Sequence, residues 1–165
     1  MEASVKQAIN MTAEELVIAD ISSSVTRMMG MAARAAMRDA GRQASHDIWR
    51  TVPEGLGRAE AAAWISARVS DIKGFGRLEV TPDDAEGFSI RFTSCAFARF
   101  TETSGAPCGE QSICYFGFGL LEETLYRLAG RRYLVTLKER DDALELCKEI
   151  AQPREQAIHA RIEGA

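Results

Sequence analysis

Residues on both sides of the segment 82–87 alternate between apolar and polar side chains. Residues 77–81 alternate around Leu78 and Val80, and residues 88–93 repeat the pattern after a segment with one proline, one glycine and three acidic residues. A period of two places successive side chains on opposite faces of a strand. The pattern therefore predicts an antiparallel hairpin with one buried face and one face in water.

A second hairpin is predicted near the end of the chain. Residues 132–139 alternate again, and the segment 144–150 can pair back after the acidic turn at residues 141–142. In that last strand, alternation places Cys147 and Glu149 on the face opposite to the leucines. On this pattern alone Cys147 need not belong to the core.

Apolar residues spaced three and four apart predict helices in the rest of the chain. A short first helix follows a capping box at residues 12–15, in which Thr and Glu can satisfy backbone N–H groups. Residues 25–49 indicate one long or kinked helix, with Gly30 and Gly41 as weak points and small residues that allow another helix or subunit to approach closely. The remaining predicted helices span residues 58–71, residues 109–128 and a last segment from Pro153 to about Ile162.

This order of elements predicts an α+β fold. N-terminal helices are expected to pack on an antiparallel sheet of two hairpins, with one helix connecting the hairpins. The length of 165 residues favours a single domain over residues 1–165. We expect an N-terminal arm over 1–24, a core over 25–150 and a C-terminal helix over 151–165.

Composition and charge exclude several classes of protein. The 20 Lys and Arg residues against 24 Asp and Glu give a formal net charge of -4, so there is no general basic field to hold nucleic acid. The chain lacks the run of about 18 apolar residues that spans a bilayer. Its N-terminus also lacks the basic flank and apolar run of an export signal. We therefore expect a cytoplasmic protein without a nucleic-acid partner or a membrane span.

The four cysteines all lie in the second half of the chain, at Cys95, Cys108, Cys114 and Cys147. Their spacing matches none of the zinc signatures that are built on paired C-x2-C units. We expect Cys95, Cys114 and Cys147 to converge around one hollow, with Cys95 and Cys114 as candidate catalytic thiols. The alternative is that each is a small buried side chain that only packs.

Aromatic residues gather in the same half of the chain and are candidates for lining a pocket for an apolar ligand. The alternative is an ordinary aromatic core. Gly117 and Gly119 are expected to thin the helix, so that a flat ligand or the sheet can come close. The candidate ligand-binding residues are Phe97, Phe100, Tyr115, Phe116, Phe118 and Tyr126.

Several short motifs match one known family. They are residues 31–44, the turn Gly74-Phe75-Gly76 before a strand, and Cys114 through Gly119 followed by Gly130, Glu139 and Cys147. Together they resemble the 4-vinyl reductase domain family over roughly residues 25 to 150. Members of that family bind small hydrophobic molecules, so the resemblance implies such binding here.

The same resemblance implies a zinc site. The family pattern is a first Cys, then Glu-x2-Cys, then a last Cys. Cys114, Glu139 and Cys147 match it, whereas Asp142 stands where the middle cysteine is expected. Because Asp binds zinc through oxygen, these four residues are the implied ligands, and a vacant site is the alternative since one thiolate is lost.

A second, local resemblance concerns residues 95–98, residues 105–107 and Cys114. They are similar to the Cys-x-[Phe/Tyr]-Ala, Gly-x-Pro, Cys run of L-2-amino-thiazoline-4-carboxylate hydrolase-like proteins. The chain departs from that run because Cys114 is followed by residues 115–117, Tyr-Phe-Gly, instead of acidic residues. The resemblance implies a thiol- or metal-assisted hydrolase of a small cyclic substrate.

Three functions therefore remain open at the level of sequence. The first is binding of a small hydrophobic or aromatic molecule, as sensor, carrier or accessory factor, in a pocket between residues 95–128 and the sheet of a homodimeric protein. The second is the hydrolase, so whether the chain is an enzyme stays open. The third is an assembly subunit of a complex, since the fold type also resembles vesicle-tethering subunits.

Overall fold

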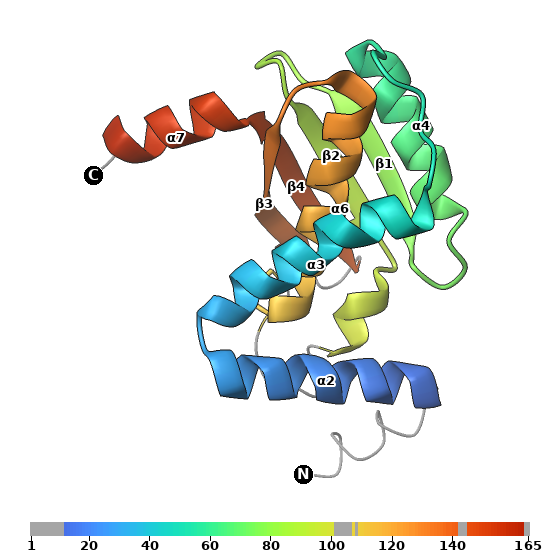
Figure 1. The fold of residues 1–165 in the computed structure, drawn as a ribbon, viewed down its shortest axis with the longest axis vertical. Coiled ribbons are helices and arrows are strands. Elements are labelled where there is room, and N and C mark those ends of the chain that lie inside the picture. Colours follow the sequence, from blue (N-terminus) through green and yellow to red (C-terminus); the bar gives the residue numbers. More distant parts are fainter. Residues whose placement is uncertain (1–11, 101–106, 108, 142–144, 164–165) are drawn as a thin grey trace.

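The computed structural model describes residues 12–100, 107, 109–141 and 145–163, and only the backbone of residues 99, 100, 161 and 163. Figure 1 shows helices packed on a single sheet, which confirms the predicted α+β class. The elements in chain order are α2 (Ala13–Met29), α3 (Ala32–Ile48), α4 (Arg58–Ser70), β1 (Arg77–Pro82), β2 (Phe88–Thr93), the 3-10 helix η1 (Ala96–Phe100), α6 (Ser112–Ala129), β3 (Tyr133–Asp141), β4 (Leu146–Pro153) and α7 (Arg154–Glu163). Within these segments, none of the helices has both the length and the apolar character needed to cross a bilayer.

The two predicted hairpins form one antiparallel sheet with the order β1-β2-β4-β3. β2 pairs with β4, so the strands that meet in the middle come from different hairpins. The register aligns Leu78, Phe92 and Cys147 in one row across three strands, and Ile90 with Glu149 in the next row. Residues of one row lie on the same face of the sheet, so Cys147 and Glu149 point to the same side as Phe92 of β2.

This register corrects the prediction that Cys147 need not be in the core. Cys147 and Glu149 are only 5% and 6% exposed, because their face of β4 is the one covered by the helices. Alternation along the strand was predicted correctly, but it does not say which face is buried. The pairing with Phe92 and Ile90 decides that question.

α4 and α6 cover this face of the sheet. α4 packs on β1 through buried residues that include Ile65 and Val69, and it ends at Ser70, close to the predicted end. α6 lies across the sheet near β3, and α3 packs along the outer side of α6 (Figure 1). The result is a sheet, a helical layer on one face of it, and α3 outside that layer.

The predicted single helix over residues 25–49 is wrong. α2 begins at the capping box, where the Thr12 hydroxyl accepts a hydrogen bond from the Glu15 N–H at 3.2 Å and the Glu15 carboxylate accepts one from the Thr12 N–H at 2.7 Å. It then runs past the predicted boundary at residue 24 to Met29. Gly30 ends it with a φ of 56°, a conformation that glycine adopts without strain. α3 follows as a separate helix.

Two glycines allow α3 and α6 to cross at close range. A Cβ on Gly41 would collide with the carbonyl oxygen of Phe116, and a Cβ on Gly119 would collide with the carbonyl oxygen of Arg38. The close approach predicted for Gly41 is confirmed. For Gly119 the neighbour is α3, and neither a ligand nor the sheet.

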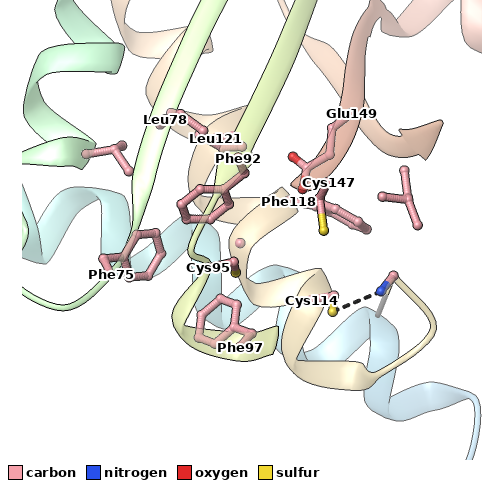
Figure 2. A pocket seen from close by; sticks show the side chains of 14 residues that line it. Phe75, Leu78, Phe92, Cys95, Phe97, Cys114, Phe118, Leu121, Cys147 and Glu149 are labelled. Carbon is pink, nitrogen blue, oxygen red and sulfur yellow. Dashed lines mark hydrogen bonds between the residues drawn. The ribbon is translucent and has the colours of Figure 1, made fainter. Parts of the chain in front are cut away.

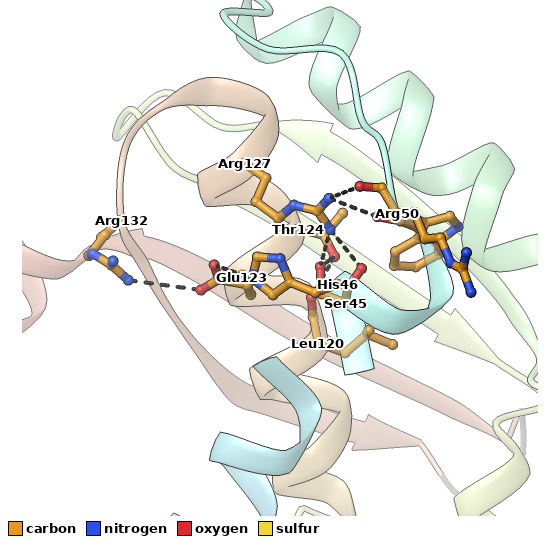
Figure 3. Close-up of polar contacts among 9 residues, drawn as sticks. Ser45, His46, Arg50, Leu120, Glu123, Thr124, Arg127 and Arg132 are labelled. Carbon is orange, nitrogen blue, oxygen red and sulfur yellow. Dashed lines mark hydrogen bonds and ion pairs between the residues drawn. The ribbon is translucent and has the colours of Figure 1, made fainter. Parts of the chain in front are cut away.

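Polar groups fix the same pair of helices (Figure 3). Arg127 of α6 donates hydrogen bonds of 2.7 Å to the carbonyl oxygens of Ser45 and Trp49, at the end of α3 where helical carbonyls have no partner in the helix. The hydroxyls of Ser45 and Thr124 are 2.9 Å apart and buried. His46 lies half-exposed on the surface, 3.1 Å from Glu123.

A buried carboxylate joins α6 to both α3 and β3. Glu122 is 4% exposed and accepts hydrogen bonds from the backbone N–H of Val135 at 3.0 Å and from Arg42 at 2.8 Å. The guanidinium of Arg38 lies 3.4 Å from the same carboxylate. These contacts hold the outer side of α6, and its inner side faces the end of the sheet.

Candidate ligand-binding site

A cavity lies between the inner side of α6 and one end of the sheet (Figure 2). The sheet contributes the row of Leu78, Phe92 and Cys147, with Glu149 one position further along β4. α6 contributes a stripe of side chains spaced three and four apart, which a helix places on one face. These α6 residues are Cys114, Gly117, Phe118 and Leu121.

Much of the remaining wall comes from segments near the two ends of the first hairpin, and Val69 of α4, Gly109 and Leu137 of β3 complete it. Phe75 precedes β1, and Cys95 and Phe97 lie where β2 gives way to η1. The ring centre of Phe75 lies 5.5 Å from the ring centre of Phe92 and 5.5 Å from that of Phe97, so three aromatic rings close this side. The structure thus places the cavity between residues 95–121 and the sheet, inside the region predicted from the sequence.

Cys95, Cys114 and Cys147 are among the residues that line this cavity. Each of them is 5 to 7% exposed. The backbone N–H of Gly109 donates a hydrogen bond to the sulfur of Cys114 at 3.1 Å. Cys108 lies outside the described residues.

The electrostatics of these thiols do not suit a nucleophile. Burial raises the pKa of Cys95 to about 12 and the pKa of Cys114 to about 11. Reactive cysteines have the opposite shift, because the attacking species is the thiolate. Protonated thiols offer a ligand a soft, weakly polar surface, and the raised pKa values of Cys95 and Cys114 argue against the thiol-assisted form of the predicted hydrolase.

The predicted aromatic residues separate into two groups. Phe97 and Phe118 line the cavity. Phe116 packs behind Phe97 with ring centres 6.3 Å apart, and Tyr115 lies beneath the guanidinium groups of Arg34 and Arg38. Tyr126 stacks on Arg132 at 4.0 Å. The side chain of Phe100 lies outside the described part of the chain.

Glu149 is the charged lining residue that sequence reasoning missed. It is the only carboxylate among the described lining residues and is 6% exposed. Burial raises its pKa to about 8, with smaller contributions from Cys147 and Cys114. Its Oε2 atom has no hydrogen-bond partner among the described residues. The signal was the shared face of Cys147 and Glu149, which the sequence revealed without showing that it was buried.

The cavity is narrow. The space open to the centres of water-sized molecules is about 20 Å³. That is enough for about one water, which needs roughly 10–15 Å³ by this measure, whereas an apolar cavity of roughly 150 Å³ is known to take benzene. A ring-sized ligand therefore requires the lining side chains to move apart.

The implied zinc ligands are not brought together. Glu139 of β3 pairs with Lys148, and its carboxylate lies 2.9 Å from the ammonium group. Lys148 lies between Cys147 and Glu149 on β4, so it and Glu139 point away from the cavity, to the opposite face. Asp142 lies outside the described residues. In the described segments no three His, Cys, Asp or Glu side chains form a group able to hold a metal, so Cys114, Glu139 and Cys147 do not form the implied site together.

Comparison with known proteins shows the kind of fold that this chain has. No protein-family model and no curated protein matches the chain. Among solved structures, it is similar to the phenol-responsive sensory domain of the transcription activator PoxR in complex with phenol. The TM-score is 0.59 with 15% identity, over 86% of this chain and 75% of that chain. At this identity the likeness establishes the kind of fold, and the resemblance to the 4-vinyl reductase domain family stays a prediction.

Proposed function

We propose that this protein binds a small aromatic or similarly hydrophobic molecule, without covalent chemistry, in the cavity between α6 and the sheet. The observation that carries the proposal is the composition of the cavity, in which Phe75, Phe92, Phe97 and Phe118 surround three buried thiols. Enclosed apolar walls with few polar groups are typical of sites for small organic ligands. The phenol-bound sensory domain with a similar fold supports the same class of ligand.

The proposed role is that of a sensor, carrier or accessory factor. A ring that enters must displace side chains, because the space available is far smaller than a ring. Ligand binding is thereby coupled to a rearrangement around α6 and the end of the sheet. A sensor requires such a coupling, because a ligand shifts the equilibrium between two conformations of a protein only when it binds one of them more tightly than the other.

A direct binding measurement tests this proposal. Isothermal titration with phenol and toluene is expected to give saturable one-site binding to the intact chain, and native mass spectrometry of the purified protein is expected to reveal any bound organic molecule. Gly117→Met places a long side chain into the cavity from the middle of α6 and is expected to abolish binding. Ala40→Met, on an exposed position of α3, is the matched control and should bind normally.

The proposal fails if neither ring compound binds, or if Gly117→Met folds and binds as tightly as the unchanged chain. Circular dichroism and a cooperative thermal transition for both variants separate loss of binding from loss of fold.

We also propose that the protein is a homodimer in which a second copy covers α2. Val17, Ile21 and Met28 fall on one stripe of this helix and are 56%, 57% and 84% exposed. α2 lies at the end of the molecule away from the sheet (Figure 1), and among the described elements it packs mainly on α3 and, less, on α6. Exposed apolar stripes of this kind mark interaction surfaces.

A further inference from the structure

Glu149 is an exception among the walls of the cavity, which are otherwise apolar or weakly polar. Figure 2 shows its carboxyl directed into the cavity, on the same side of β4 as the Cys147 thiol. It belongs to the central strand β4, which is hydrogen-bonded on both sides and so holds the residue firmly in place. Its neighbour in the register, Ile90 of β2, is apolar and fully buried.

The position of Glu149 is costly for the protein. A buried polar atom without a partner loses its hydration and gains no hydrogen bond in return. Of the described residues, none donates to Oε2. Packing alone gives no reason for a carboxyl here, because the neighbouring positions of the same face, Cys147 and Ala151, are filled by small apolar side chains.

Chemistry identifies the kind of group that would compensate this cost. A carboxyl oxygen accepts hydrogen bonds, so the missing partner is a donor. Burial favours the protonated form of Glu149, which is neutral and in addition offers one O–H group. A neutral hydroxyl matches this carboxyl in full, because it both donates and accepts.

We propose that Glu149 is the specificity-determining residue of the cavity, and that its ligand is an aromatic or similarly apolar molecule bearing one neutral hydrogen-bond donor, a hydroxyl group above all, that pairs with the Glu149 carboxyl. This inference rests on the proposed function, since it requires that the cavity binds such molecules. It adds the position of the polar group and the residue that selects for it. A site built to hydrogen-bond a ligand hydroxyl discriminates strongly against the analogue without it, because its own polar group is then left unpaired.

The test compares phenol with toluene, which have the same ring and differ in a hydroxyl or a methyl group. Titration of the full chain is expected to show a preference for phenol of about tenfold, the value of one well-formed hydrogen bond. Glu149→Met removes the polar group at similar length and is expected to abolish the preference or reverse it. Glu149→Gln keeps a carbonyl acceptor and is expected to retain most of it.

Glu139→Gln is the matched control, because it makes the same change on the opposite face of the sheet and should leave the preference intact. Equal affinity of the unchanged chain for phenol and toluene would overturn the inference and leave the proposed function standing. So would an undiminished preference in Glu149→Met. If Glu149→Met does not fold, Glu149→Gln provides the test. Complete loss of the preference for phenol in a folded Glu149→Gln would contradict the inference that the side-chain carbonyl oxygen accepts the hydrogen bond of the ligand hydroxyl. Absence of binding of both compounds to the unchanged chain would overturn the proposed function, and this inference with it.

Discussion

Gly41 of α3 and Gly119 of α6 each lie against the backbone of the opposite helix, so neither position has room for even one methyl group. The two contacts are reciprocal, since the carbonyl oxygen of Phe116 blocks the first and that of Arg38 blocks the second. This crossing sets the distance between α3 and α6. It therefore also sets where α6 presents its inner side to the cavity.

Gly119→Ala is expected to lower the free energy of unfolding by about 1–3 kcal/mol, because overpacking against backbone forces the helices apart. The control lies two residues earlier in the same helix. Gly117→Ala meets only Phe97 at 3.5 Å, an ordinary contact, and alanine gains about 0.8–1 kcal/mol of helix propensity over glycine. Urea denaturation of both variants checks this, and equal stabilities would contradict the tight crossing.

Glu122→Gln is expected to destabilise the fold by about 3 kcal/mol, because it leaves the guanidinium groups of Arg38 and Arg42 partly buried without their counter-charge. The control substitution, Glu139→Gln, breaks an exposed ion pair with Lys148, and such pairs contribute about 0–1 kcal/mol. Chemical denaturation at neutral pH provides the comparison. If Glu122→Gln lowers the free energy of unfolding as little as the control does, the buried cluster makes no net contribution to stability.

The stability of the protein is expected to depend on pH through Glu149. Its pKa is about 8 in the folded state against an ordinary value of 4.5, so the folded state holds one more proton between these limits. Stability then falls as pH rises through this window. Below and above the window this group adds no further pH dependence, and the stability lost within the window stays lost above it. Glu149→Gln should remove this part of the slope. Denaturation curves below, within and above the window test it, and an unchanged slope in the variant would assign the effect elsewhere.

Leu121→Ala is expected to enlarge the cavity and to tighten binding of benzene or toluene, while lowering the free energy of unfolding by about 2–5 kcal/mol. Leu120→Ala is the control. Leu120 is the adjacent residue of α6 and fully buried but does not line the cavity, so its loss should cost similar stability with no gain in binding. Calorimetric titration measures both. Equal affinities in the two variants would mean that the space at Leu121 is not the binding space.

A charge within the apolar stripe of α2 is expected to prevent dimer formation. Ile21→Glu should convert a dimer into a monomer in analytical ultracentrifugation, because it places a carboxylate where a second copy would pack. Asp20→Glu, at an exposed neighbouring position, preserves charge and is the control. A monomeric unchanged chain, or a dimer that survives Ile21→Glu, would rule out this interface.

Local patterns in the sequence predicted most of the elements. The alternation around Leu78 and Phe88 identified the first hairpin, and the capping box at Thr12 identified the start of α2. The break between α2 and α3 was missed because residues 25–49 keep a helical spacing through Gly30. Only the positive φ of that glycine separates the two helices.

The site was predictable only in part, because it depends on contacts between distant segments. The cysteines carried enough chemical identity to be grouped from the sequence. Phe75 and Leu78 did not, since they join the cavity through the packing of β1 against β2 and α4. Glu149 was placed on the correct face of its strand, but burial of that face follows from its register with β2, which a single strand does not encode.

β4 has one further property that follows from its place in the chain. It carries Cys147 and Glu149 at the floor of the cavity, and α7 starts at Arg154, directly after its last residue. β4 is paired with β2 on one side and β3 on the other, so one continuous paired segment runs from Cys147 to the start of α7. A ligand that displaced Cys147 or Glu149 would therefore act on the segment of chain that leads directly into α7.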